Sequence, residues 1–158
     1  MLDLLRTRIV EPLLGLLRQG TSPRELSLCI AIGAGVGTFP VLGVSTPALT
    51  AIALWRRLNL VTIQLMSWVV APIQLVLIIP FMRLGERIVG VPPQPLTVDE
   101  GMRLLEDGVL HAIVTLWDAI VHATIGWLLV APIGIWLLHL SLTPLLTKLA
   151  LRFSGSST

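Results

Sequence analysis

Three long apolar runs without a charged side chain dominate the pattern of this chain. They cover residues 26–55, 58–82 and 119–147. About 20 apolar residues are enough to cross the hydrocarbon core of a bilayer, so each run is long enough to do so. A single soluble domain of 158 residues has too little interior to bury all three. The pattern therefore predicts an all-α integral membrane protein, a helical bundle whose apolar faces contact lipid.

The first run contains residues that break helices. Gly33 to Pro47 holds four glycines and two prolines, too many for one straight helix. At membrane depth, unpaired backbone N–H and C=O groups are tolerated only where protein or a watery cavity covers them. We therefore expect broken or re-entrant helices here: a hairpin over residues 22–57, with two half-length arms and a turn near Thr38 to Gly43.

The borders of this hairpin carry a helix-start signal and basic residues. Ser22 can serve as an N-cap, with Glu25 three residues later completing a capping box. Arg24 precedes the apolar run, and Arg56 and Arg57 follow it. The positive-inside rule then predicts that both ends of the hairpin face the cytoplasm.

The rest of the sequence completes a single membrane domain over residues 1–158. Pro132 interrupts the third apolar run, so we expect a break there. The N-terminal part, residues 1–20, can lie in the plane of the membrane interface or pack on the rest of the protein as a soluble helix. The expected parts outside the hairpin are an amphipathic N-terminal helix at 1–20, a second membrane segment at 58–88, a proline-rich loop at 89–100, and amphipathic then membrane helices at 101–152.

Composition and charge indicate more closely which class of protein this is. Only 13% of the residues are charged, against about 25% in ordinary soluble domains. The formal charge of +2 is too small to indicate nucleic-acid binding, and the eleven Lys and Arg residues border the apolar runs, as expected beside anionic lipid. We expect a multi-pass protein of the bacterial inner membrane, without a cofactor. Its expected partners are membrane lipids and further copies of itself, since so small a bundle hardly covers its own broken backbone.

A known family shares part of this pattern. The run from Ser22 to Glu86 resembles the prokaryotic membrane family called domain of unknown function 2062. Many relatives have Phe where Gly35 stands and Asn where Ala71 stands. The resemblance carries no settled activity; some relatives look like fusions with glycosyltransferase or methyltransferase domains, which implies work near lipid-linked sugars. The matching residues are Ser22-Pro23, Gly33, Gly37, Pro40, Gly43, Thr46, Leu58-Asn59, Pro72 and Arg83-Leu84-Gly85.

Polar groups of the turn, of the second run and of the flanking arginines are candidates for contact with a lipid headgroup. Freed backbone groups and hydroxyls can meet a polar ligand, and arginine binds phosphate bidentately. The alternatives are snorkelling of the arginines to ordinary lipid phosphates, interhelical hydrogen bonds of the glutamines, and an Arg83–Glu86 pair one turn apart. The candidate substrate-binding residues are Thr38, Pro40, Gly43, Ser45, Thr46, Arg56, Arg57, Asn59, Gln64, Gln74, Arg83 and Glu86.

A second candidate site is a stripe of acidic and imidazole side chains. Asp107, His111, Asp118 and His122 lie within a narrow arc of one helical face. Such groups can bind zinc or relay protons, but their spacing is no dedicated metal signature such as His-Glu-x-x-His. The alternative is the wet face of an amphipathic helix, in which Asp118 and His122 pair one turn apart.

These observations predict a protein that binds or translocates an anionic lipid or a lipid-linked intermediate. That role requires a polar pocket at the turn from Thr38 to Pro47. A non-catalytic membrane scaffold that docks partners is the first alternative and predicts tight packing without a cavity. A membrane metalloenzyme is the second alternative and rests only on the Asp/His stripe. No catalytic set is recognisable, so we expect no enzyme activity.

Overall fold

The computed structural model describes residues 15, 21–41, 43–93 and 109–154, with side chains from 116 to 151 in the last range. The expected helix at 1–20 and most of the loop at 89–100 lie outside the described residues. The described part is helical and contains no strand, which confirms the predicted all-α class. Its helices are α3 (Pro23–Gly37), α4 (Ser45–Arg56), α5 (Leu60–Val89) and α7 (Val109–Ser154).

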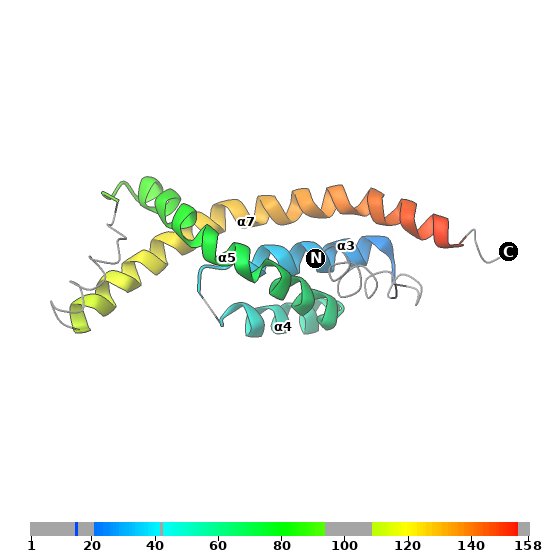
Figure 1. The fold of residues 1–158 in the computed structure, drawn as a ribbon, viewed down its shortest axis with the longest axis horizontal. Coiled ribbons are helices and arrows are strands. Elements are labelled where there is room, and N and C mark those ends of the chain that lie inside the picture. Colours follow the sequence, from blue (N-terminus) through cyan, green and yellow to red (C-terminus); the bar gives the residue numbers. More distant parts are fainter. Residues whose placement is uncertain (1–14, 16–20, 42, 94–108, 155–158) are drawn as a thin grey trace.

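The break in the first apolar run lies where the sequence predicts it. Helix α3 ends at Gly37 and α4 begins at Ser45, and the two helices lie side by side with opposite directions (Figure 1). Gly43 in the connecting turn has a φ of 85°, a conformation that side chains with a Cβ atom rarely adopt. The two arms and α5 enclose a buried apolar cluster of Cys29, Leu49, Ala53 and Ile63.

The helix ends follow local capping chemistry. The Ser22 hydroxyl accepts the backbone N–H of Glu25 at 3.2 Å, which confirms the predicted N-cap of α3. Arg57 ends α4 in the left-handed region, with a φ of 52°. Asn59 then caps α5, because its Oδ1 accepts the backbone N–H of Thr62 at 2.9 Å.

Two helices are long and apolar enough to cross a membrane, Leu60–Val89 in α5 and Leu116–Leu151 in α7. Both contain prolines and yet stay continuous. The predicted break at Pro132 is wrong, since α7 continues through Pro132 and Pro144 and only curves along its length (Figure 1). Both prolines lie on exposed faces, where the ring displaces no packed neighbour, and the helix accommodates the lost hydrogen bond and the clash with the carbonyl of residue i−4 by curving.

Helix α7 runs along the whole molecule, crossing α5 near one end and lying against α3 toward the other (Figure 1). Leu26, Ile30 and Leu146 form a buried cluster between α3 and α7, and Phe81, Met82 and Ala123 form another at the crossing of α5 and α7. Large apolar side chains remain on the outside. Trp68, Trp117 and Trp136 are 69%, 65% and 61% exposed, as expected for faces that contact hydrocarbon.

Candidate functional site

Two glutamines from α5 bind backbone carbonyls of the broken stretch, one in the connection between α3 and α4 and one in the first turn of α4. Gln74 Nε2 donates to the carbonyl oxygen of Phe39 at 2.6 Å. Gln64 Nε2 donates to the carbonyl oxygen of Thr46 at 3.1 Å and to the hydroxyl of Thr50 at 3.2 Å. Gln64 therefore binds the neighbouring helix α4, as predicted, whereas Gln74 binds the connection that precedes α4. The carbonyl group of Phe39 in the break is thus paired inside the protein, as an apolar surrounding requires.

The end of α3 is fixed in the same way from α7. The indole Nε1 of Trp127 donates to the carbonyl oxygen of Gly35 at 3.1 Å, and the Thr38 hydroxyl donates to the same oxygen at 2.8 Å. The rings of Phe39 and Trp127 meet edge to face with their centroids 5.0 Å apart. Trp127 thus holds both the last turn of α3 and the first residues of the connection.

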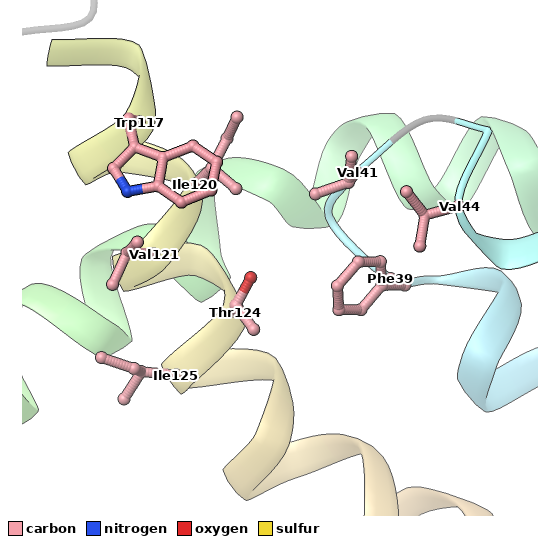
Figure 2. A pocket seen from close by; sticks show the side chains of 8 residues that line it. All are labelled: Phe39, Val41, Val44, Trp117, Ile120, Val121, Thr124 and Ile125. Carbon is pink, nitrogen blue, oxygen red and sulfur yellow. The ribbon is translucent and has the colours of Figure 1, made fainter. Parts of the chain in front are cut away.

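An apolar groove of about 490 Å³ opens between this turn and α7 (Figure 2). The Thr124 hydroxyl and the indole N–H of Trp117 are the polar side-chain groups among its lining residues. The volume falls within the range of roughly 300–1,000 Å³ in which proteins bind small molecules. The wall consists of Phe39, Val41 and Val44 from the turn and Trp117, Ile120, Val121, Thr124 and Ile125 from α7.

The groove exists because α3 stops while the face of α7 that packs on it continues. Ile135, His139 and Leu146 on this face contact α3. Trp117 and Thr124 continue the same face toward the start of α7 at helical spacing. Since α3 ends at Gly37, the short connection is the only described segment that covers this face of α7 beyond that point. This face is concave there and carries no helix of the described part.

The predicted turn residues do not make this groove polar. Pro40 and Ser45 are buried, and the Thr38 hydroxyl binds within α3. Gly43 and Thr46 are exposed. The expected polar pocket is therefore an apolar one at the same place, because most of its lining residues are apolar and the Thr38 hydroxyl is bound to the Gly35 carbonyl oxygen.

The other candidate substrate residues lie in separate places. Asn59 is engaged as the cap of α5. Arg56 and Arg57 end α4 beside the start of α5, whereas Arg83 lies near the far end of α5 and binds Glu86 at 3.0 Å, as its spacing predicts. A helix of 30 residues is about 45 Å long, so these arginines do not meet at one mouth.

The Asp/His stripe is only partly described. Asp107 lies outside the described residues, and His111 lies on α7 with its side chain outside them. Asp118 is exposed, while His122 has a buried Nδ1 without a hydrogen-bond partner. Among the described side chains, no three His, Cys, Asp or Glu residues stand close enough to hold a metal ion.

One polar cluster, between α3 and α7, was not predicted from the sequence. The Ser27 hydroxyl on α3 lies 2.8 Å from His139 Nδ1 and 2.8 Å from the Thr143 hydroxyl on α7. Ser27 is fully buried. The partners are more than 100 residues apart along the chain, so no local pattern joins them. The sequence signal that could have indicated the cluster is the pair of polar residues His139 and Thr143, one turn apart within an uncharged run.

Comparison with known protein families gives a match over most of the chain. The family described as "Uncharacterized protein conserved in bacteria (DUF2062)" matches residues 7–152. No curated protein and no solved structure matches the chain. The similarity first seen between Ser22 and Glu86 therefore extends over nearly the whole sequence.

Proposed function

Since the chain belongs to DUF2062, an uncharacterised bacterial family, we propose its function from its own geometry: it binds an anionic lipid or a lipid-linked intermediate in the membrane. One acyl chain of that lipid occupies the groove between residues 38–44 and α7. The observation that carries the proposal is the groove itself, apolar on nearly its whole wall. Its α7 wall lies within Leu116–Leu151, a segment long and apolar enough to cross a membrane.

The depth of the groove supports an acyl chain as its occupant. Arg24 begins α3 and Arg56 ends α4, so these basic residues lie at one end of the antiparallel pair. The turn lies at the other end, about 22 Å away along the 15 residues of α3. With the basic end at a membrane surface, the groove lies inside a hydrocarbon core about 30 Å thick, past its middle. Acyl chains are the ligands available at that depth.

The basic end supports the anionic headgroup. Arg24, Arg56 and Arg57 are exposed there, and Lys148 on α7 lies at the same end, next to the residues that pack on the start of α3. Guanidinium groups bind phosphate bidentately, and clustered basic residues attract anionic lipid. A lipid whose headgroup lies at this end can extend its chain along the hairpin into the groove.

The proposal includes the bacterial inner membrane as location, with the basic end in the cytoplasm, and a homo-oligomer as working form. The exposed apolar faces of α5 and α7 support contact with lipid or with further copies. The groove favours lipid binding over a tightly packed scaffold, which needs no cavity. Translocation is the further step in which the bound lipid crosses along the same hairpin.

A photoactivatable lipid tests the tail site. The protein is reconstituted in nanodiscs that contain phosphatidylglycerol with a diazirine near the end of one acyl chain. We expect crosslinks on the turn and on the part of α7 around Val121, and Val121→Trp reduces them several-fold by filling the groove. Leu128→Trp is the matched control, because Leu128 is exposed on α7 outside the groove. Equal crosslinking of all exposed faces, unchanged by Val121→Trp, rejects the tail site.

Native mass spectrometry tests the headgroup. Purified protein is offered phosphatidylglycerol and phosphatidylcholine with identical acyl chains. We expect retained phosphatidylglycerol, and its loss in the variant carrying Arg56→Gln and Arg57→Gln. Arg87→Gln is the matched control, because Arg87 is exposed at the far end of α5. If both lipids are retained equally, selection of an anionic headgroup is rejected. Binding of the acyl chain in the groove is then decided by the crosslinking experiment alone.

A further inference from the structure

We infer that His139, held by Ser27, is a proton-binding site within the apolar interface of α3 and α7. His139 lies inside Leu116–Leu151, and ionisable residues in membrane-crossing helices commonly serve ion or proton pathways. This inference does not depend on the lipid proposal, because it concerns another interface and another ligand. It follows from counting the hydrogen atoms that the cluster can supply.

The cluster contains four short contacts. Ser27 Oγ lies 2.8 Å from the carbonyl oxygen of Arg24, 2.8 Å from His139 Nδ1 and 2.8 Å from Thr143 Oγ1. Thr143 Oγ1 lies 2.7 Å from the carbonyl oxygen of His139. Carbonyl oxygens only accept, so the hydrogen atoms must come from the two hydroxyls and from the imidazole.

The count favours a proton on Nδ1. The two hydroxyls supply two hydrogen atoms. If Nδ1 carries no hydrogen, two of the four contacts therefore have no hydrogen atom between their polar atoms and are not hydrogen bonds. A hydrogen on Nδ1 fills a third contact by donating to Ser27 Oγ, and Ser27 then donates to the carbonyl oxygen of Arg24. The neutral ring is therefore held as the Nδ1–H tautomer, because the bond made by one ring nitrogen decides which nitrogen carries the proton.

The other ring nitrogen is then a free proton acceptor. In the Nδ1–H tautomer, Nε2 carries a lone pair. Within the described residues no hydrogen bond occupies His139 Nε2, and the atom is not sealed off from the surface. Protonation adds one proton to this lone pair, breaks no bond and leaves the bond from Nδ1–H to Ser27 in place. The cluster thus accepts a proton without rearranging the interface.

The charged groups around the cluster are few. Arg24 and Glu25 begin α3, and Lys148 lies on α7 two turns beyond His139. The other titratable group of α3, the Cys29 thiol, packs against α4 and α5. Helix α5 packs here through Met66, and it has no charged side chain between Leu60 and Met82. No carboxylate of the described residues belongs to the cluster, so within this part of the chain the two hydroxyls orient the ring.

Nitrogen-15 NMR of the histidine rings tests the inference on the full chain in nanodiscs. The spectrum of His139→Gln is subtracted from that of the wild type to isolate His139. In alkaline buffer, where the ring is neutral, we expect the Nδ1–H tautomer in roughly tenfold excess, the effect of one hydrogen bond. On acidification, the Nε2 signal moves to its protonated position while the Nδ1 signal hardly changes.

Ser27→Ala removes the acceptor of Nδ1–H and shifts the tautomer ratio roughly tenfold toward Nε2–H, the effect of losing one hydrogen bond. Thr147→Val is the matched control, because the Thr147 hydroxyl donates only to the carbonyl oxygen of Thr143. A wild-type ring that is mainly Nε2–H, or whose Nε2 signal does not move on acidification of the folded protein, overturns the inference. The wild-type spectrum decides this even if Ser27→Ala does not fold, and an unchanged ratio in folded Ser27→Ala also counts against the site.

Discussion

The backbone carbonyl oxygen of Phe81 on α5 lies directly against Gly126 on α7, with no room for a side chain between them. A Cβ atom placed on Gly126 overlaps this oxygen. One turn away, a Cβ atom on Gly85 of α5 overlaps the carbonyl oxygen of His122 on α7. Each helix therefore supplies one glycine to the crossing. Such small residues let two membrane helices approach to backbone contact.

Gly126→Ala tests this crossing. The added methyl group meets backbone, which cannot rotate away, so the two helices must separate. We expect a loss of stability of about 1–3 kcal/mol, the range for overpacking a well-filled interface. Thermal unfolding in detergent, followed by loss of helical circular dichroism, measures it.

The control for this change lies on the same helix. Gly134 is exposed and a Cβ atom there meets nothing within 4 Å. Gly134→Ala should leave stability unchanged or raise it slightly, because alanine favours the helix. Equal effects of the two substitutions contradict a close crossing at Gly126.

Gln74→Leu tests how the broken backbone is held. The substitution keeps much of the volume but removes the donor for the Phe39 carbonyl oxygen, which is then buried without a partner. We expect a loss of about 1–3 kcal/mol and faster hydrogen exchange of the amides from Phe39 to Val44. Ser141→Ala is the control, since its exposed hydroxyl binds only the Leu137 carbonyl of its own helix. Unchanged exchange in the turn counts against a structural role of Gln74.

Arg83→Ala tests the ion pair near the end of α5. The Glu86 side chain is only 2% exposed, whereas Arg83 is 35% exposed. Removing Arg83 takes away a charge-assisted hydrogen bond from a buried carboxylate, and we expect a loss of about 1–2 kcal/mol after allowance for solvent at Arg83. Arg87→Ala, at an exposed position of the same turn, should cost little. Equal melting temperatures of the two variants speak against the pair.

Local features of the fold could be predicted from the sequence because their causes are local. The Ser22 cap and the Arg83–Glu86 pair each join residues three positions apart. The break after Gly37 follows from closely spaced glycines and prolines. Pro132 misled the prediction for the opposite reason, since the exposed position of its ring on α7 depends on how this helix packs against the rest of the protein.

The groove and the histidine cluster depend on contacts between distant parts of the chain. The position of Thr38 predicts a pocket at the turn, but the apolar character of the pocket depends on Trp117 and Val121, about 80 residues further on. Ser27 and His139 come together only because α7 packs along α3. Residue spacing within one helix could not reveal either relationship.

The depth of Val44 in a bilayer tests the central claim most directly. The claim is that the turn between α3 and α4 lies deep in the membrane while the end of α4 stays at its surface. Nitroxide labels are placed at Val44→Cys and, separately, at Arg56→Cys in a Cys29→Ala background. Both positions are exposed, so each accepts a label. Relaxation by lipid-soluble oxygen and by a water-soluble nickel chelate then reports the depth of each label.

The account predicts that the Val44 label collides mainly with oxygen and lies about 15–20 Å deeper than the Arg56 label, the length of α4. A Val44 label that is as accessible to the nickel chelate as the Arg56 label contradicts the account, because the turn then lies in water.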